Sequence, residues 1–462
     1  MRFKQLAVGL LSAAVFFSSV PAVPVMADGE IADFAGLLTF LHQDTAVEKS
    51  NSLSASIENR GSDGYASSLY TEDNIGWKTS NGQDADYSIQ HWSHLTGTVN
   101  LDLKGFNISI PADSVDSGLV HIDGAIGSDL AEDAGAAKLS ITNTGSTENS
   151  GEIKLTASGE NCGNIITLLC GRQTPELDIG SNVTINNQDG KRSAVYVLDG
   201  EKFKGTAKIV NKGTLISNAG STQGTIRIGL TDAYSNLTVE NDGGTIKAGT
   251  DGKAIYIKNE TKGDGIIKGG TIEGDIINAS TDDSGNSIFE FDGCNIKGKI
   301  ESTGKGEILL KGNCTLDGDI ATSDNGVVNI VLATLTGENK ISGVASFDGA
   351  VTNNGTYTCN SDTDIVYTTV GGDIKNEGSI VGGIISGTGK FGGTGTYKPK
   401  KFEESATFKI TGGVWSIDPT THVDTNSYII TEAGEGENKT WTVAVKPTPT
   451  PAPSYPDPDP DP

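Results

Sequence analysis

The residues that could support chemistry on a polysaccharide are few, and they are scattered along the chain. A lyase needs a basic side chain, commonly arginine, beside acids that hold calcium, so that a proton next to a carboxylate can be removed. Beyond position 27 the arginines are Arg60, Arg172, Arg192 and Arg227. Asp189 and Asp199 flank Arg192, but the turn-forming sequences NNQDGKRS and VLDGEK explain both aspartates. We therefore expect no lyase site there.

Hydrolysis would need paired acids near a histidine-containing loop. The adjacent pair Asp282 and Asp283 lies in STDDSGN, which is typical of a plain turn. The histidines are all remote from this pair in the sequence: His42, His91, His94, His121 and His422. HWSH, residues 91–94, has two imidazoles three positions apart, but no third ligand follows at a suitable spacing. We expect neither catalytic residues nor a bound metal.

Three weaker motifs add no site. GTGKFG, residues 387–392, matches GxGxxG, but no βαβ pattern surrounds it and 61 glycines make a chance match unsurprising. DGD, residues 317–319, lies in an acidic loop without the spacing of a calcium motif, so only weak, nonspecific cation binding is expected. The sequons at Asn236 and Asn259 reflect a chain rich in Asn and Thr. No cofactor is implied.

A repeated Asn-x-Gly triplet indicates the elements that would have to position any functional residue. Counted where strand-like residues follow it, the triplet occurs at Asn143, Asn211, Asn241, Asn353 and Asn376. All but one of the intervals between these asparagines are near multiples of the last and shortest one, from Asn353 to Asn376. A period of that length is typical of a solenoid, whose short repeats bury a face only by stacking.

The apolar residues within a repeat alternate, as they do in strands. In GTIKAGTDGKAIYIKN, residues 244–259, Ile255 and Ile257 should point inward while Tyr256 and Lys258 point outward. Such strands would pair in parallel from coil to coil. The stretch from about residue 95 to about residue 445 then predicts an all-β solenoid of about 16 coils, roughly 75 Å long.

Two stretches repeat one pattern: DGCNIKGKI from residue 292 and GNCTLDGDI from residue 312. Aligned, they place Cys294 over Cys314 and Gly298 over Gly318 on successive coils. Neighbouring strands put Cα atoms about 4.8 Å apart, which permits a disulfide, although parallel Cβ vectors make it awkward. We favour two unbonded inward thiols, with the disulfide as the alternative. The five cysteines include no CxxC pair and do not indicate a disulfide scaffold.

Residues 1–27 have the features of a secretory signal. MRFK is basic, the run from Leu6 to Val20 is apolar, and Val25-Met26-Ala27 is a small-residue cleavage pattern. This apolar run is shorter than the roughly 20 residues that a helix needs to span a bilayer. We expect residues 1–27 to be a cleaved signal peptide, with an uncleaved anchor as the alternative, and no membrane insertion of the mature chain.

The two ends of the mature chain should differ from its middle. Residues 28–94 are expected to form an N-terminal cap and irregular first coils. Within 31–41, four apolar residues from Ile31 to Leu41 would share a helical face that suits a lid, or the segment is a short helix or strand before the first coil. Residues 447–462 hold more than half of the 14 prolines, which predicts a disordered, extended linker. That linker would join a further segment or enter a cell wall.

The charge of the mature chain limits its partners. Removing the signal takes away Arg2 and Lys4 and no acid, so 34 − 2 = 32 basic side chains remain against 59 acidic ones, a net charge of −27. A chain with this large negative charge repels nucleic acid and anionic lipid. The evenly spread Ile, Val and Leu residues favour an ordered core over disorder.

Three stretches resemble exported β-helix proteins of bacteria. GTVNLDLKGFNIS (97–109) looks like their opening coil, where an LDLxGxxI phrase begins the solenoid, and LDIGSNVTINN (177–187) resembles later coils. The stretch ITGGVWSIDPTTHVDTNSYIITEAGEGENKTWTVAVK (410–446) is similar to a closing module of Gram-positive surface proteins, with Val414-Trp415 where a small residue and Phe are usual. The Asn-x-Gly coils also resemble autotransporter passengers.

This resemblance implies a right-handed parallel β-helix with a pectate-lyase-like fold over residues 95–400, followed by a closing β module over 401–446. It also implies export to, or release from, a bacterial cell surface. The motifs are informative about architecture and bring no catalytic residues with them.

We therefore expect a secreted or cell-surface protein, not an enzyme, that acts as an adhesin-like or structural stalk. Binding would come from exposed strand faces and corner loops, including Tyr196, Tyr234 and Tyr256 where they face outward. The expected partners are host or cell-surface glycans or proteins, and nothing indicates an oligomeric state. The alternative is a carbohydrate-active β-helix enzyme, a polysaccharide lyase or glycoside hydrolase, which would need a groove lined by several acids and a basic residue.

Overall fold

The computed structural model describes most of the chain from residue 138 onward and short strands before it. The described ranges are 30–31, 56–57, 94–96, 98–102, 107–111, 120–123, 138–143, 151–156, 163–171, 173–190, 192–199, 205–220, 222–250, 252–282, 287–323 and 325–449. The predicted signal peptide and residues 450–462 lie outside them. No helix within these ranges is long and apolar enough to cross a membrane. The chain divides into two compact units, residues 1–333 and 334–462.

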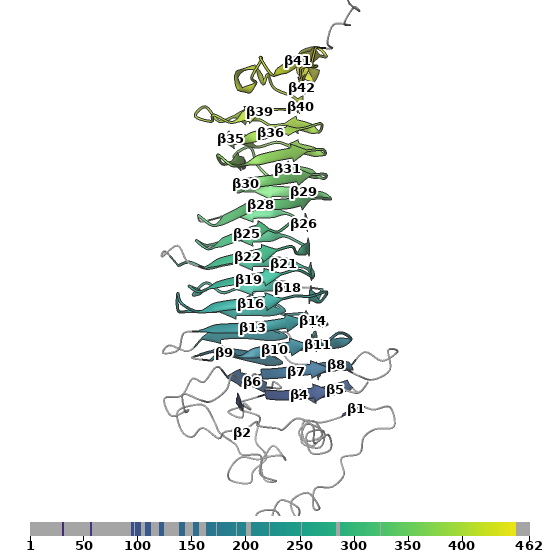
Figure 1. Cartoon of the computed structure of the whole chain (residues 1–462), viewed down its shortest axis with the longest axis vertical. Helices are drawn as coiled ribbons and strands as arrows, with labels where there is room; N and C mark the ends of the chain where they lie inside the picture. Colours follow the sequence, from purple (N-terminus) through teal and green to yellow (C-terminus); the bar gives the residue numbers. More distant parts are fainter. Residues whose placement is uncertain are drawn as a thin grey trace, which may run out of the picture. The chain divides into compact units, whose positions relative to one another are not determined.

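Each unit is a right-handed parallel β-helix, as predicted. Within the described residues of the first unit three strands make one coil, and β4 to β27 form eight such coils. Figure 1 shows the coils stacked one after another. The first wall contains β4 (Thr98–Asp102), β7 (Lys138–Thr142), β10 (Glu176–Ile179), β13 (Thr206–Asn211), β16 (Asn236–Glu240), β19 (Asp264–Lys268), β22 (Ile288–Asp292) and β25 (Glu307–Lys311).

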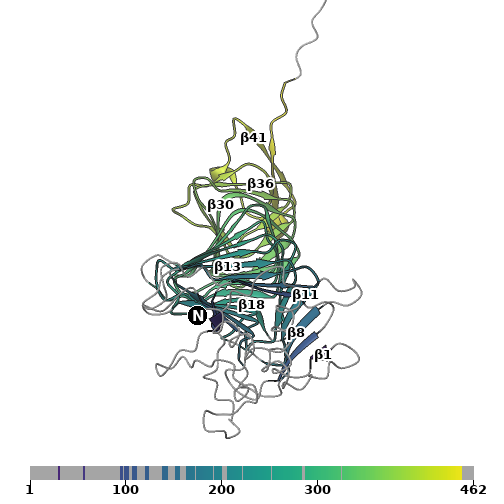
Figure 2. The ribbon, with the colours of Figure 1, turned by 60° about the horizontal axis from the view of Figure 1, so that its bottom comes forward.

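The other two walls of this unit are built in the same way. Figure 2 shows the stack tilted, with β8, β11, β13 and β18 labelled. The second wall contains β5 (Asn107–Pro111), β8 (Gly151–Thr156), β11 (Val183–Asn187), β14 (Thr214–Ser217), β17 (Thr245–Ala248), β20 (Thr271–Glu273), β23 (Asn295–Lys297) and β26 (Cys314–Asp317). The third wall contains β6 (Val120–Asp123), β9 (Ile166–Cys170), β12 (Val195–Asp199), β15 (Ile226–Gly229), β18 (Lys253–Ile257), β21 (Asp275–Asn278), β24 (Ile300–Ser302) and β27 (Ile320–Thr322).

Three short strands lie before or beside the first complete coil. β1 (Glu30–Ile31) pairs with β5, and β3 (His94–Thr96) pairs in parallel with β6 and antiparallel with β2 (Ser56–Ile57). Ile31 begins the segment for which a helical lid and a short helix or strand were both considered, and it lies in a strand. Residues 32–41 lie outside the described ranges. β28 (Val327–Leu335) runs across the division between the units.

The coils of the first unit shorten along the chain. Leu177 pairs with Ile209 in an early coil, whereas Phe291 pairs with Leu310 in a late one, and the first pair is separated by many more residues than the second. The predicted uniform period is therefore wrong for this unit. Corner loops of different length join strands that stack in register, apart from one irregularity between β18 and β21 near Lys253. The long early coils reduce the number of coils that a given length of chain can make.

The core of the first unit is a set of apolar side chains stacked from coil to coil. Along the first wall one inward row contains Leu139, Leu177, Ile209, Val239, Ile267, Phe291 and Leu310, all buried. Burying one such side chain contributes about 1.5–3 kcal/mol. Because an isolated strand cannot bury this face, the stacking holds the fold together.

Four of the predicted Asn-x-Gly triplets have a buried asparagine at a corner, namely Asn211, Asn241, Asn353 and Asn376. The Oδ1 of Asn211 accepts a hydrogen bond from the N–H of Gly213, two positions on (3.2 Å), and its Nδ2 donates to Asn241 on the next coil (2.8 Å). Both asparagine side chains are fully buried. One amide thus closes its own turn and joins two coils, which is why this residue pattern recurs at corners.

The predicted register of the two cysteine stretches is confirmed. Asn295 at the start of β23 pairs with Thr315 on β26, so the residues before them, Cys294 and Cys314, are neighbours on successive coils. Both cysteines are buried, and neither is in a disulfide. At the adjoining corner a Cβ on Gly318 would lie 1.8 Å from the carbonyl oxygen of Gly298. Only glycine permits that approach of two coils.

The second unit has shorter coils and an antiparallel end. Its parallel strands are β29 (Glu338–Ser342), β30 (Val344–Asn353), β31 (Thr356–Cys359), β32 (Ile365–Thr368), β33 (Asp373–Asn376), β34 (Ser379–Val381), β35 (Ile384–Gly387), β36 (Lys390–Gly393), β37 (Thr396–Lys398), β38 (Lys401–Phe402), β39 (Lys409–Ile410) and β40 (Gly413–Trp415). β42 (Thr440–Val445) then pairs antiparallel with both β40 and β41 (Tyr428–Ala433). This pairing ends the parallel stack at β40.

Aromatic side chains fill the core of this second unit near its antiparallel end. Trp415, at the position where the resembled module usually has Phe, is fully buried and stacks on Tyr397 with ring centroids 4.0 Å apart. Its indole N–H donates to the carbonyl oxygen of Gly412 (2.9 Å), so its polar atom is satisfied.

Candidate functional site

The outer face of the third wall in the first unit brings together side chains that are far apart in the sequence. Tyr196 on β12 is in register with Arg227 on β15, and Arg227 with Tyr256 on β18. In each strand the neighbours on either side point into the core, and these three side chains are partly exposed. We call Tyr196, Arg227 and Tyr256 the tyrosine–arginine row. It spans three coils at about 4.8 Å per step.

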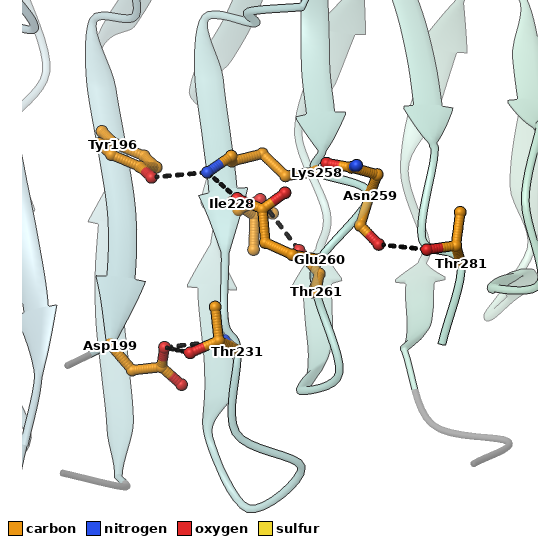
Figure 3. A network of polar contacts seen from close by, with 9 residues as sticks. All are labelled: Tyr196, Asp199, Ile228, Thr231, Lys258, Asn259, Glu260, Thr261 and Thr281. Atoms are coloured by element: carbon orange, nitrogen blue, oxygen red, sulfur yellow. Dashed lines mark hydrogen bonds and ion pairs between the residues drawn. The ribbon is translucent and has the colours of Figure 1, made fainter. Parts of the chain in front are cut away.

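Two cations lie against the ring of Tyr196. The Cζ of Arg227 is 4.8 Å from the ring centroid and the Nζ of Lys258 is 5.8 Å from it. Lys258 also donates a hydrogen bond to the Tyr196 hydroxyl (3.3 Å), as Figure 3 shows. Its side chain crosses Gly229 on the coil between them, where a Cβ would lie 3.0 Å from Lys258 Cδ and 3.1 Å from Tyr196 Oη. The absence of a side chain at Gly229 makes this reach possible.

Glu260 supplies the acid of this face. Its carboxylate forms an ion pair with Lys258 (Figure 3). Burial alone would raise the pKa of Glu260, but the hydrogen bond from Lys258 and the positive charge of Arg227 outweigh it and lower the pKa. Glu260 is therefore ionised at neutral pH, and its charge offsets that of Lys258.

Tyr256 lies at the other end of the row. The Nζ of Lys253 is 5.8 Å from its ring centroid. Burial raises the pKa of the Tyr256 hydroxyl, although the charge of Arg227 acts in the opposite direction. The hydroxyl therefore keeps its proton at neutral pH and can donate a hydrogen bond.

Arg227 is the central side chain of the row and is left without an acidic partner. Within the described part of the chain it forms no ion pair, and its Nε is buried with no hydrogen-bond partner. A buried donor left unpaired costs about 1–3 kcal/mol. Because Nε is buried and the residue as a whole is partly exposed, an acceptor from outside would meet the rest of the guanidinium and not this Nε.

Polar bonds below the row fix the corners that present it. The carboxylate of Asp199 accepts hydrogen bonds from the Thr231 N–H and hydroxyl (both 2.8 Å) and from the Asp232 N–H (2.9 Å). The Thr281 hydroxyl donates to the carbonyl oxygen of Asn259 (3.1 Å), and the Thr261 hydroxyl to that of Ile228 (3.2 Å). Figure 3 shows these bonds joining successive coils.

The residues considered for lyase chemistry do not assemble. Asp199 is committed to the turn at Thr231, and Asp189 forms an ion pair with Lys154 (3.0 Å). Among the described residues neither pairs with Arg192. Arg60, Arg172 and Asp283 lie outside the described ranges, whereas Asp282 lies in the corner after β21.

The histidines are placed in three different ways. His94 and His121 are in register on β3 and β6, a neighbour relation that their spacing in the sequence did not suggest. His42 and His91 lie outside the described ranges. His422 lies in the second unit, stacked on the Phe408 ring at 4.1 Å, with Nδ1 3.2 Å from the Phe408 carbonyl oxygen.

The other motifs lie at corners. GTGKFG covers the corner between β35 and β36, and DGD the corner between β26 and β27. The described residues contain no group of three or more His, Cys, Asp or Glu side chains that could hold a metal ion. Tyr234 is 71% exposed, but it lies in the loop after β15, outside the row.

The alternation in the sequence placed Tyr256 on an outward position and Tyr196 was named as a candidate if it faced outward, but nothing in the sequence revealed Arg227 between them. The step along the chain from Tyr196 to Arg227 is longer than the step from Arg227 to Tyr256, so no fixed period aligns the three. Comparison with known proteins adds no name to this face: no family model, no curated protein and no solved structure matches the chain.

Proposed function

We propose that this protein is a secreted or cell-surface stalk that binds glycans outside the bacterial cell in an adhesin-like way, through the tyrosine–arginine row. The signal-like residues 1–27, the acidic composition and the resemblance of three stretches to surface β-helix proteins support the location. The row itself supports the binding role.

The single observation that carries the proposal is the register of Tyr196, Arg227 and Tyr256 on one outer face. Aromatic rings offer flat apolar area, and one face of a sugar ring consists largely of C–H bonds that pack on such an area. The Tyr256 hydroxyl and the amino group of Lys258 can donate hydrogen bonds to sugar hydroxyls. Because the wall is a stacked sheet, these groups are held in place before any ligand arrives.

We propose binding without cleavage. A general acid at neutral pH needs a carboxyl group with a raised pKa, whereas the pKa of Glu260 is lowered by its pairing with Lys258. Incubation with a panel of polysaccharides should give no new reducing ends and no unsaturated uronates. Release of either product would favour the carbohydrate-active enzyme instead.

The proposal is tested by applying the purified, full chain to an array of glycans, matrix proteins and whole cells. We expect glycan binding that weakens about tenfold or more in the Tyr196→Ala/Tyr256→Ala double variant. Tyr234→Ala is the matched control, because it removes an exposed tyrosine outside the row, and it should bind like the wild type.

Two results would contradict the proposal. If the wild-type chain binds nothing on the array, the protein is a structural spacer. If the double variant binds as well as the wild type while its melting temperature is unchanged, the ligand uses another surface.

A further inference from the structure

Several outward lysines of the first unit are paired with acids, whereas Arg227 is not. On the first wall Lys138 pairs with Glu176 (2.9 Å), on the second wall Lys297 pairs with Glu273 (3.2 Å), and beside the row Lys258 pairs with Glu260. Arg227 has no such partner among the described residues. Lys262 and Lys268 also form no ion pair among the described residues, but both are exposed, whereas Arg227 is partly buried against the Tyr196 ring. The missing negative charge is the first indication of what binds there.

The geometry around Arg227 selects the kind of anion. Its guanidinium group is held against the Tyr196 ring, 4.8 Å from the centroid, in the middle of a row flanked by tyrosines. A planar guanidinium binds a carboxylate through two parallel N–H···O bonds. The tyrosines on either side offer uncharged, partly apolar surface. A ligand with a carboxylate at its centre and neutral groups on both sides therefore matches the order tyrosine, arginine, tyrosine along the row.

The surroundings disfavour a ligand that is charged throughout. Along the wall the outward position after Tyr256 belongs to Ile277 and the next to Glu301, while Glu260 lies beside Arg227. Lys258 and Lys253 lie beside the tyrosine rings of the row, but a polymer with one negative charge per unit that continued past Tyr256 would place its further charges against Ile277 and Glu301. The net charge of −25 on the whole chain adds to that repulsion.

From these observations we infer that the ligand is a glycan with one carboxylate-bearing sugar among neutral sugars, and that its carboxylate pairs with Arg227. This inference rests on the proposed function and narrows its ligand class. It makes Arg227 the residue that determines specificity and the two tyrosines the residues that hold the neutral sugars.

The test compares four probes by calorimetry on the full chain. They are an oligosaccharide with one carboxylate-bearing sugar, the same compound with that carboxyl group reduced to an alcohol, a uniformly carboxylated oligosaccharide of equal length, and a sulfated analogue. We expect the first to bind about tenfold or more tightly than each of the others. Its affinity should fall as NaCl is raised, and that of the reduced compound should not.

Variants assign this preference to Arg227. In Arg227→Gln the first probe and its reduced form should bind with equal affinity, and the affinity for the reduced form should stay unchanged. Arg227→Lys should keep part of the difference in affinity between the two probes. Lys262→Gln removes one positive charge from an exposed position on the next coil and is the matched control. It should behave like the wild type.

The possible results distinguish failure of this inference from failure of the proposed glycan-binding function. Equal affinity for the acidic and reduced compounds, or tighter binding of the uniformly charged or sulfated probe, overturns the inference and leaves glycan binding intact. Failure of all four probes and of the glycan array overturns both. If Arg227→Gln melts early, the comparison is made with Arg227→Lys, whose unchanged preference would also refute the assignment.

Discussion

Asn211 and Asn241, far apart in the chain, are joined by a buried hydrogen bond of 2.8 Å between their side-chain amides. The same contact recurs in the second unit, where Asn353 donates to Asn376, again at 2.8 Å. Three of these amides also close their own corners, each by accepting from the N–H of a glycine two positions on. The stack of coils therefore has polar cross-links inside its corners as well as apolar rows along its walls.

Replacing Asn241 should weaken the fold. Asn241→Ala removes the acceptor of the Asn211 amide and leaves a buried donor unpaired, so the free energy of unfolding should fall by about 1–3 kcal/mol. Urea denaturation followed by circular dichroism measures this. Asn236→Ala, at an exposed strand position, is the control and should stay within about 0.5 kcal/mol of the wild type. Equal effects of both variants would show that the amide ladder does not stabilise the corners.

The four described cysteines should be free and protected. Cys170, Cys294, Cys314 and Cys359 are buried, and hydrogen bonding to Cys314 together with burial raises the pKa of Cys294. We expect negligible alkylation of these four in the native protein. In guanidinium chloride all four should be alkylated equally with and without prior reduction, as read by peptide mass spectrometry. A linked Cys294–Cys314 peptide that is present without reduction and disappears after it would establish the disulfide instead.

Acidification should destabilise the protein in part through His422. Burial lowers the pKa of His422 below 6.5 in the folded state, whereas the unfolded chain keeps the ordinary value. As the pH falls below about 6.5 the unfolded chain takes up the proton first, so stability decreases. Melting temperatures at pH 7.5 and pH 5.5 measure the change, and His422→Gln should show a smaller drop than the wild type.

Protonation of carboxylates changes the stability of the protein at lower pH than protonation of His422, so the two effects can be measured separately. The pKa of Asp424 is lowered by the hydrogen bond from Ser427, and that of Glu273 by the hydrogen bond from Lys297. Each stabilises the fold above its unfolded pKa of about 4, and that contribution is lost as the pH falls through the folded value. An identical pH 7.5 to 5.5 drop in wild type and His422→Gln would refute a role for the imidazole.

The N-terminal prediction is tested by export. Expressed with its natural start in a secreting host, the protein recovered outside the cell should begin at Asp28, because Val25-Met26-Ala27 precedes it. Edman sequencing or mass spectrometry identifies the terminus. Replacing Ala27 with a bulky charged residue should block processing at this position. A secreted chain that retains residues 1–27 would favour the uncleaved anchor.

Much of the fold could be predicted because its signals are local. The alternation around Ile255 and Tyr256 specifies a half-buried strand, and Asn211 followed by Gly213 specifies a corner, whatever lies elsewhere in the chain. The near-identity of the stretches around Cys294 and Cys314 even predicted their register. The coil length could not be predicted in the same way, because insertions in corner loops, such as those that lengthen the coil from Leu177 to Ile209, leave the stacking unchanged.

The sequence by itself therefore determined the architecture, namely strands with one apolar face, corners of Asn and Gly, and a parallel stack that buries what a single coil cannot. Only the tertiary structure decided which outward side chains become neighbours. Tyr196, Arg227 and Tyr256 meet because the apolar rows inside the wall set the register of β12, β15 and β18, although a full coil of chain separates each from the next. Register is a property of packed strands and not of spacing along the chain, so the binding face appears only once the coils are stacked.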